Sequence, residues 1–441
     1  MSWYEESVIY QIYPLGFCGA PKKNNGKLVS RIRKVVDWIP YYKELGIDVI
    51  LFNPIFESEL HGYDTMEYKK VDVRLGSNKD FQYVSEELHN NGIRVMIDGV
   101  FNHVGRGFFA FQDVLKNREN SRYKDWFYMK FEEDSPYKDG FGYVGWEGHY
   151  DLVKLNLENE EVVEYLFSAI RQWVEEFDID GLRIDVAYCI SKSFLRRLRA
   201  FTTSLKQDFI LTGEVLFGDY NIFVNDQMLQ SCTNYECYKG IHSSLNDLNL
   251  FEINYSLNRQ FSKRQNGIYQ SLSLLNFVDN HDVSRIASIL NDKEELPLAY
   301  TLLFTMPGVP CIYYGSEWAE KGDKKDGDYK LRPKLKAPVK NEHFLLNKLL
   351  ISIYKQEKAL QYGGYETVSI TNKQLVFKRE YKKETVIVLL NAENKRKSVS
   401  LGEIKGQATN LLTKQPAVLE SEIVMEPYDV MLFKLSACKM K

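Results

Sequence analysis

Arg183 and Asp185 place a cation and an anion in a segment that otherwise has the composition of a buried strand. The stretch 177–186 reads FDIDGLRIDV, with mostly apolar residues around the two charges. Residues two apart on a strand point to the same side. Because burying an unpaired charge costs several kcal/mol, the two must pair with each other or serve a polar site where the strand ends.

Further polar residues follow other predicted strands at the same end. They are Asp98, Asn102 and His103 after one strand, Glu214 after a second, and Asp279, His281 and Asp282 after a third. A single carboxylate at a strand end is usually a cap or a turn former. Several carboxylates with two histidines and an arginine at one edge instead predict a site for acid–base or nucleophilic chemistry.

Eight short apolar runs, alternating with helical patterns, would position these residues. The predicted strands are 7–14, 47–53, 93–101, 177–186, 209–215, 228–235, 274–280 and 309–315, and predicted helices include 30–45, 160–176, 193–206 and 344–357. This alternation favours an α/β fold, a parallel (β/α)8 TIM barrel, over an open sheet. Active sites of such barrels lie at the carboxyl-terminal rim, where the polar residues are expected to meet.

Two segments depart from the alternation. About 50 residues after the third strand are rich in aromatic residues and glycine and too long for a connecting loop, which predicts a small inserted subdomain. The C-terminal part changes to alternating strands such as 374–379 and 385–390, typical of an antiparallel β-sandwich. We therefore expect a barrel formed by 1–103 and 157–361, an inserted subdomain over 104–156, and a C-terminal β-sandwich domain over 362–441.

Charge and composition narrow the range of partners. The 441 residues carry 57 Lys and Arg against 60 Asp and Glu, a net charge of −3, without a long basic run, so neither nucleic acid nor a membrane is expected as partner. The first residues, MSWYEESVIYQIYP, lack the basic and apolar regions of a signal peptide. We expect a cytoplasmic protein with a neutral ligand. The six scattered cysteines are expected to be reduced.

Carboxylates without a serine or cysteine nucleophile motif suit glycoside hydrolysis, in which one carboxylate attacks and another protonates the leaving oxygen. Arg183 beside Asp185 favours the ionised form that a nucleophile needs. Glu214 stands between Gly213 and Val215 with less cationic company, so it is expected to keep a proton for general-acid work.

Four stretches of the chain resemble the motif regions of the alpha-amylase family of glycoside hydrolases. They are DGVFNH at 98–103, GLRIDVA at 181–187, GEV at 213–215 and FVDNHD at 277–282, and the resemblance covers roughly residues 7–335. LVKLN at 152–156 is similar to a signature of the neopullulanase and cyclomaltodextrinase branch. We find no match to the N-terminal carbohydrate-binding domain usual in that branch, and the sequence leaves the oligomeric state open.

The resemblance implies a role for each matching residue. Asp185 would be the nucleophile, Glu214 the general acid/base, and Asp282 the residue that stabilises the transition state. Substrate contacts would come from Tyr63, His103, Arg183, His281, Asp64 and Arg332, and structural support from Asp98 and Asn102. Asp64 and Arg332 resemble a pair that reads the non-reducing end in exo-acting relatives, with a plain salt bridge as the alternative.

Two departures from the family pattern affect linkage preference and metal binding. Ala187-Tyr188-Cys189 follows the nucleophile and Val215-Leu216-Phe217 follows the acid, so preferences on the leaving-group side are not inherited. The loop PKKNNG at 21–26 is basic where calcium-dependent relatives are acidic, and Asn102 alone is a poor hard-cation site. We expect no cofactor and no required metal, with calcium binding left open.

The sequence is therefore interpreted as a retaining α-glucan hydrolase. It would cleave α-1,4 bonds, with α-1,6 bonds left open, in maltooligosaccharides and cyclodextrins through a covalent glucosyl intermediate on Asp185. A 4-α-glucanotransferase-type transglycosylase using the same residues stays an alternative, as does a catalytically silent sugar-binding protein on the same scaffold. Intact Asp185, Glu214 and Asp282 argue against the silent protein.

Overall fold

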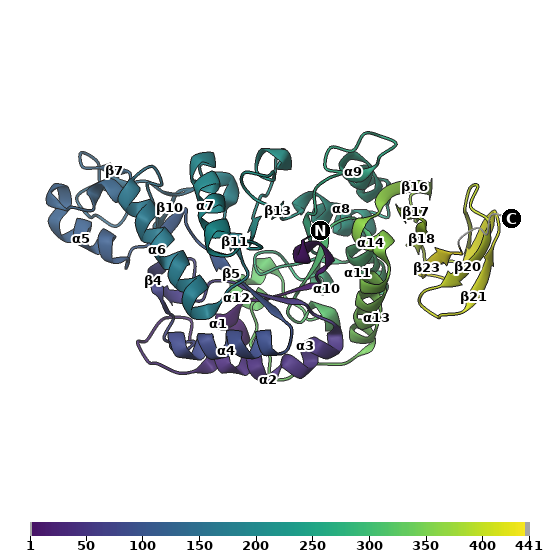
Figure 1. The fold of residues 1–441 in the computed structure, drawn as a ribbon, viewed down its shortest axis with the longest axis horizontal. Coiled ribbons are helices and arrows are strands. Elements are labelled where there is room, and N and C mark those ends of the chain that lie inside the picture. The colour runs from purple at the N-terminus through teal and green to yellow at the C-terminus, as the bar shows by residue number, and fades with distance from the viewer. Residues whose placement is uncertain (1, 437–441) are drawn as a thin grey trace.

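A closed barrel of parallel strands forms the centre of the computed structural model, which describes residues 2–436 (Figure 1). Its strands are β1 (Ile9–Ile12), β2 (Val49–Phe52), β5 (Arg94–Gly99), β11 (Gly181–Ile184), β12 (Ile210–Gly213), β13 (Ser231–Cys232), β14 (Leu275–Asn276) and β15 (Val309–Tyr313). They run in the order β13-β12-β11-β5-β2-β1-β15-β14. A parallel bridge between Thr233 and Leu275 joins the two ends, so the predicted TIM barrel is confirmed.

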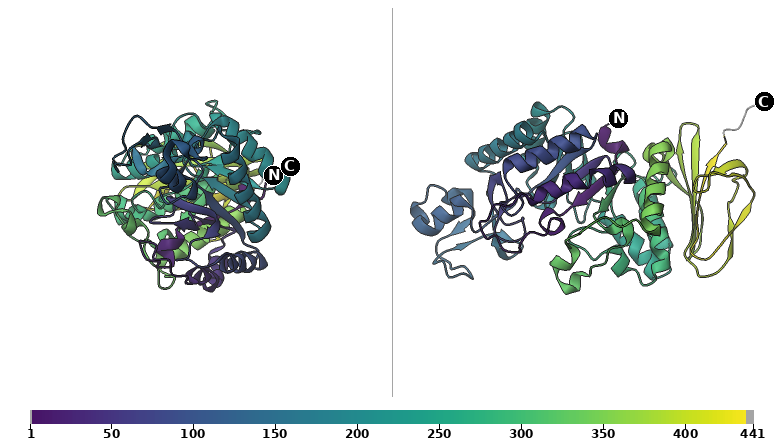
Figure 2. Two further views of the ribbon diagram at one scale, coloured as in Figure 1. Left: turned by 90° about the vertical axis from the view of Figure 1, so that its left-hand side faces the viewer. Right: turned by 90° about the horizontal axis from the view of Figure 1, so that it is seen from below.

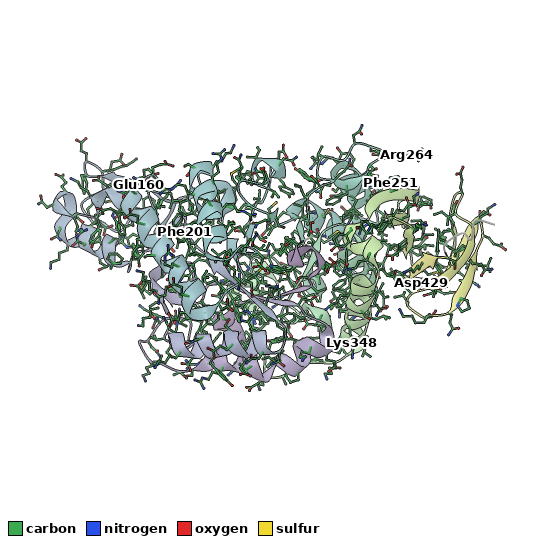
Figure 3. The ribbon with its side chains drawn as sticks, viewed as in Figure 1. Glu160, Phe201, Phe251, Arg264, Lys348 and Asp429 are labelled. Carbon is green, nitrogen blue, oxygen red and sulfur yellow. The ribbon has the colours of Figure 1, made fainter. Side chains whose placement is uncertain are left out.

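Helices cover the outside of the barrel (Figure 2). The longer ones are α3 (Ile39–Leu45), α4 (Asn78–Asn90), α6 (Glu160–Phe177), α7 (Lys192–Leu205), α8 (Tyr235–Asn246), α9 (Phe251–Phe261), α11 (Leu296–Thr305) and α13 (Glu342–Gln356). On α6 the side chain of Asn159 caps the first turn, and Leu166, Ile170 and Trp173 are buried at helical spacing. Glu160 of the same helix lies on its outer side, exposed to solvent (Figure 3).

Local structure differs from the predictions at three places. The helix predicted over 30–45 is divided into a 3-10 turn, α2 (Lys34–Asp37) and α3, because Pro40 lacks an N–H and is accommodated only in the first turn of a helix. Strands β13 and β14 are two residues long, shorter than predicted. A hairpin of β3 (Phe56–Ser58) and β4 (Thr65–Val71), which the sequence analysis did not predict, follows β2.

The segment after β5 forms a small structure at one end of the molecule, on the left in Figure 1. It contains a three-stranded sheet of β6 (His103–Gly105), β10 (His149–Lys154) and β9 (Gly145–Trp146), the pair β7 (Met129–Lys130) and β8 (Gly142–Tyr143), and α5 (Phe109–Asn117). Phe111 packs edge-on against Phe127 and Tyr143, with ring centroids 5.4 and 4.9 Å apart. The aromatic richness of the insertion thus supplies its own core.

The C-terminal part is antiparallel and lies at the opposite end of the barrel (Figures 1 and 2). One sheet has the order β16-β17-β18-β23-β20-β21, and β19 pairs with β22. The strands are β16 (Gly364–Ile370), β17 (Gln374–Tyr381), β18 (Glu384–Asn391), β19 (Lys397–Ser400), β20 (Gly406–Asn410), β21 (Pro416–Leu419), β22 (Glu422–Met425) and β23 (Val430–Leu435). Val376, Leu389 and Val399 belong to the separate hydrophobic core of this part. The limits of the three predicted domains remain our proposal.

Within residues 2–436, no helix combines the length and the apolar character needed to cross a membrane.

Candidate active site

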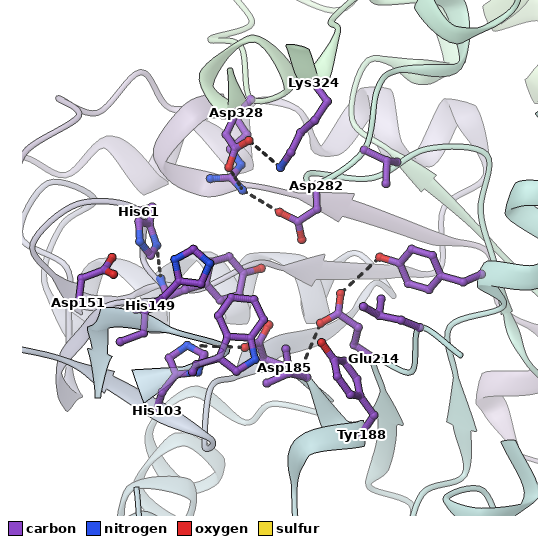
Figure 4. A pocket seen from close by; sticks show the side chains of 18 residues that line it. His61, His103, His149, Asp151, Asp185, Tyr188, Glu214, Asp282, Lys324 and Asp328 are labelled. Carbon is purple, nitrogen blue, oxygen red and sulfur yellow. Dashed lines mark hydrogen bonds and ion pairs between the residues drawn. The ribbon is translucent and has the colours of Figure 1, made fainter. Parts of the chain in front are cut away.

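A pocket of about 520 Å3 opens at the carboxyl ends of the barrel strands (Figure 4). Six of the predicted site residues line it, namely Tyr63, His103, Asp185, Glu214, Asp282 and Arg332. They come from segments as far apart in sequence as the β3–β4 loop and the region after β15, so only the closed barrel brings them together. The pocket size is typical of small-ligand sites.

Arg183 joins three carboxylates beneath the pocket. Strand β11 is in register with β5 so that Arg183 lies opposite Asp98, and Nη1 donates to both oxygens of Asp98 at 2.6 and 2.8 Å. The same nitrogen lies 3.3 Å from Asp185, and Nη2 lies 2.8 Å from Glu214. All four side chains are buried. The guanidinium is therefore fixed by Asp98 and sets the positions of the other two carboxylates.

The prediction that Glu214 has less cationic company than Asp185 is wrong. Besides the contact with Arg183, its carboxylate accepts hydrogen bonds from the backbone N–H of Val186 at 3.1 Å and from the Tyr235 hydroxyl at 3.4 Å. Strand β12 lies beside β11, so a side chain just past the end of β12 is within reach of the arginine two strand positions earlier on β11. This pairing across strands cannot be read from the residues adjacent to Glu214 in sequence.

Val186 adopts an unusual backbone conformation directly after Asp185. Its φ of 40° and ψ of 47° lie in the left-handed region, which is a genuine outlier for a β-branched residue and costs on the order of 1–3 kcal/mol. The turn directs its N–H to Glu214. Gly213 allows the turn after β11 to pack closely against β12, because a Cβ at this position would lie 2.9 Å from the Ala187 Cβ. The strained backbone of Val186 thus lies between Asp185 and the carboxylate of Glu214.

The protonation of Asp185 also differs from the prediction. Burial and the nearby Glu214 carboxylate raise the pKa of Asp185 well above its usual value, and Arg183 offsets only part of this effect. The sequence analysis considered the arginine alone and expected an ionised carboxylate. In the substrate-free pocket the protonated form of Asp185 is therefore favoured more than the sequence analysis expected.

Asp282 has the opposite environment on the other wall. It lies 2.8 Å from the Nε2 atom of His281 and 2.8 Å from Nη2 of Arg332. Although partial burial acts in the other direction, these two neighbours hold the pKa of Asp282 well below its usual range. The pocket therefore contains one carboxylate that is held in its ionised form, opposite a carboxyl whose pKa is raised.

His103 presents a polar nitrogen to the pocket. Asn102 Nδ2 donates to His103 Nδ1 at 3.2 Å, an assignment that places the ring proton on Nε2. That Nε2 is buried, lies 4.0 Å from Asp185, and has no hydrogen-bond partner among residues 2–436. Burial lowers the pKa of His103 to about 3, so the ring is neutral. A buried donor of this kind is available to a ligand hydroxyl.

His281 stands behind the pocket wall rather than in it. The ring is fully buried, and Tyr63 stacks on it at a centroid distance of 5.5 Å. The Tyr63 hydroxyl donates to Asp98 at 2.8 Å, and His281 Nδ1 is 3.1 Å from the amide of Gln11. His281 therefore acts on the pocket through Tyr63 and Asp282, and a direct contact with substrate is not supported by its burial.

Asp64 and Arg332 do not form the predicted pair. Asp64 is buried outside the pocket lining and accepts hydrogen bonds from four consecutive backbone N–H groups, those of residues 59–62. Arg332 instead lies 2.8 Å from Asp282 and 3.5 Å from Asp328. Neither the substrate-reading pair nor the plain salt bridge between Asp64 and Arg332 that the sequence analysis considered is therefore present.

Several pocket residues were missed by the sequence analysis. They are His61, Trp146, His149, Asp151, Leu152, Val186, Tyr188, Leu216, Tyr235, Val283, Lys324 and Asp328. Trp146 and His149 stack on each other at 5.4 Å and come from the inserted segment. Its wealth of aromatic residues was a visible signal, but without a regular period the sequence did not indicate which of them face the barrel.

No group of three or more His, Cys, Asp or Glu side chains in the described part of the chain is arranged to hold a metal ion. Asn102, the hard-cation ligand considered from the sequence, uses its side-chain amide on His103. Independence from calcium stays a prediction.

Comparison with known proteins decides the family. Residues 11–358 match the profile described as "Alpha amylase, catalytic domain". The chain belongs to the alpha-amylase family. It is accordingly a glycoside hydrolase, as the sequence motifs predicted.

Relatives within the alpha-amylase family match almost the whole chain. A cyclomaltodextrinase of Thermoanaerobacter pseudethanolicus is 30% identical, with 98% of this chain and 78% of the relative covered. A maltogenic alpha-amylase of Bacillus acidopullulyticus is 31% identical, with 96% and 76% covered. Among solved structures, an alpha-amylase from Geobacillus thermoleovorans complexed with acarbose superimposes with a TM-score of 0.84 at 26% identity and covers 99% of each chain.

Proposed function

We propose that this alpha-amylase family enzyme hydrolyses α-1,4 glucosidic bonds of maltooligosaccharides and cyclodextrins with retention of configuration. The observation that carries the proposal is Arg183, which holds Asp185 and Glu214 in one buried pocket while Asp282 stays ionised opposite them. Retaining glycosidases need two such carboxyls roughly 5 to 5.5 Å apart. The names of the relatives, cyclomaltodextrinase and maltogenic alpha-amylase, support α-glucans as substrates.

The first step requires a proton on Glu214 and an ionised Asp185. Glu214 gives its proton to the glycosidic oxygen, the C1–O bond breaks, and a carboxylate oxygen of Asp185 bonds to C1. Arg183 and the Val186 N–H then stabilise the Glu214 carboxylate that is left. The ionised Asp282 faces the positive charge that develops on the sugar ring.

In the second step water replaces the leaving group. Glu214 removes a proton from the water, the oxygen attacks C1, and the bond to Asp185 breaks. Two inversions at C1 give an α-anomer. His103, with its unpartnered Nε2–H, is placed to donate to a hydroxyl of the reacting sugar.

Stereochemistry tests this assignment directly. Proton NMR during hydrolysis of maltotriose is expected to show the α-anomer of the new reducing end first, followed by slow mutarotation. If the β-anomer appears first, Asp185 is not a nucleophile and the two carboxyls act by single displacement.

A specific observation also favours transfer to a sugar acceptor. Phe217, just past the acid, is 68% exposed and packs against Tyr188 with ring centroids 5.4 Å apart, beside Leu216 in the pocket wall. Exposed aromatic rings on the leaving-group side favour a bound sugar over water as acceptor. With maltotriose, glucose and maltose alone would mean hydrolysis, and products longer than maltotriose would mean transfer.

A further inference from the structure

Three cavities meet around residues 59–62, which we call the ridge. The catalytic pocket shares His61, Asp328 and Arg332 with a second cavity of about 430 Å3. It shares Asp151 with a third cavity of about 240 Å3. Leu60, at the tip of the ridge and 45% exposed, lines both the second and the third. The ridge therefore divides two spaces that both adjoin the catalytic pocket.

Both spaces lie on the side of the sugar that the enzyme retains. Glu214 and Tyr188 stand at one side of the pocket, whereas His61, Asp151 and Asp328 stand at the other (Figure 4). Under the proposed mechanism Glu214 protonates the leaving oxygen, so the leaving group lies on its side. The divided side then receives the non-reducing part of the substrate.

The ridge is held rigidly. Both oxygens of the buried Asp64 accept hydrogen bonds from its four backbone N–H groups at 2.7 to 3.1 Å. Arg74 is fully buried, pairs with Asp72 at 2.7 Å, and donates to the Leu60 carbonyl at 2.8 Å. A wall that is fixed before binding adds no ordering cost when a ligand contacts it.

Each space is lined by a half-exposed tyrosine ring that carries a cation on one face. In the second cavity the Lys22 ammonium lies 3.9 Å from the centre of the Tyr329 ring. In the third, the Arg106 guanidinium lies 3.9 Å from the Tyr137 ring. Aromatic faces combined with a few hydrogen-bonding groups are what neutral, hydroxyl-rich ligands require.

The third cavity also offers an uncommitted acceptor. Arg106 is fixed by two hydrogen bonds to Asp139, at 2.9 and 2.8 Å, whereas the Asp151 carboxylate has no hydrogen bond or ion pair within residues 2–436. At about 240 Å3 this space is below the range typical of whole-ligand sites and suits a single ring. The second cavity, nearly twice as large, suits a longer chain.

We propose that the ridge separates the two arms of a branched α-glucan, with the 4-linked chain in the second cavity and a single 6-linked glucosyl unit in the third. A branch-point glucose carries chains on O4 and O6, and both lead toward non-reducing ends. Both arms therefore leave the retained sugar on the same side of the bond that is cleaved. A division on this side matches that chemistry, whereas a linear chain fills one arm only. This inference rests on the proposed function.

The test compares p-nitrophenyl α-maltotrioside with the same compound carrying one α-1,6-linked glucosyl branch on the first or second glucose from the nitrophenyl group. The wild type is expected to release nitrophenol from at least one branched isomer with a kcat/KM no lower than from the linear compound. Tyr137→Ser should lower kcat/KM about 10-fold for that branched isomer and leave the linear value within twofold.

Tyr128→Ser is the matched control, since Tyr128 is 40% exposed on the same inserted segment and lines none of the three cavities. It should change neither value. Rejection of both branched isomers by an enzyme that cleaves the linear compound overturns the inference, as does an equal loss on both substrates in Tyr137→Ser.

If neither compound is cleaved, the proposed function fails, and calorimetry then tests the ridge alone. Tighter binding of a branched than of a linear maltooligosaccharide, lost in Tyr137→Ser and kept in Tyr128→Ser, supports the division. Equal binding of the two overturns it.

Discussion

The two walls of the pocket are built on different principles. On the barrel wall, Arg183 is bonded to Asp98, Asp185 and Glu214, and all four are buried. On the wall contributed by the inserted segment, Asp151 has no polar partner within residues 2–436, and the Trp146 indole nitrogen is likewise unpartnered there. The charged groups of the first wall are paired with one another, whereas the second wall leaves the Asp151 carboxylate for a ligand.

This difference separates the residues that carry out the reaction from those that select the sugar. A nucleophile and an acid must keep a fixed spacing, which a rigid, hydrogen-bonded strand network provides. Groups that choose among sugars must instead exchange water for ligand hydroxyls, so they stay half-exposed on short strands and loops. Substitutions on the barrel wall should therefore change kcat, and those on the inserted wall should mainly change KM.

The largest effect is expected for the two carboxyls of the barrel wall. Asp185→Ala and Glu214→Ala should each lower kcat for maltotriose on the order of 10^4-fold or more, since neither step proceeds without them. With α-maltosyl fluoride and azide, Glu214→Ala should form the α-azide, because the covalent intermediate still forms and is then displaced. Asp185→Ala should form only the β-azide, by direct displacement. The reverse pattern, read by NMR, would exchange the two roles.

A second effect concerns stability behind the barrel wall. Burial raises the pKa of Glu317 from its ordinary 4.5 to about 7, against hydrogen bonds from Tyr41 and Tyr10 that act in the other direction. The unfolded chain thus loses this proton near pH 4.5, and the folded chain keeps it up to about pH 7. The free energy of unfolding therefore falls by roughly 3 kcal/mol as pH rises from about 4.5 to about 7.

Urea unfolding of the wild type and Glu317→Gln at pH 4.5 and 7.5 measures this loss. The amide can still accept both tyrosine hydrogen bonds, so the variant should lack this part of the pH dependence. Identical pH profiles for the two proteins would show that Glu317 is ionised in the folded state.

A smaller effect is expected on the inserted wall. Trp146→Ala removes the ring that stacks on His149 at 5.4 Å, and KM for maltotriose should rise about 10-fold with kcat within a factor of three. Trp146→Phe keeps an aromatic ring, so its KM for maltotriose should lie close to that of the wild type. A fall in kcat matching that of the barrel-wall variants would remove the distinction between the walls.

The smallest effect is expected from chelation. Activity and melting temperature should be unchanged after EDTA treatment, because no group of three or more His, Cys, Asp or Glu side chains within residues 2–436 is arranged to hold a metal ion. Loss of either property, restored by calcium, would contradict this.

Sequence reasoning predicted the barrel and its catalytic rim because their signals are local. Strand alternation, and polar residues just after strands such as Asp98 and Asp185, can be read from neighbouring positions. The environment of Glu214 was mispredicted because its cation comes from the adjacent strand and its third donor, Tyr235, from beyond β13. The Asp64 ridge was missed because four backbone amides give no side-chain signal.

Because of the conformation of Val186, the main chain itself helps to position the carboxyls of Asp185 and Glu214 relative to each other. The N–H that binds Glu214 belongs to the residue covalently attached to Asp185. The nucleophile Asp185 and the acid Glu214 are thus linked through one peptide unit, which helps to fix their relative positions. The pocket lining can diverge while this link is kept, because reshaping the walls for new sugars leaves the hydrogen bond from the Val186 N–H to Glu214 in place.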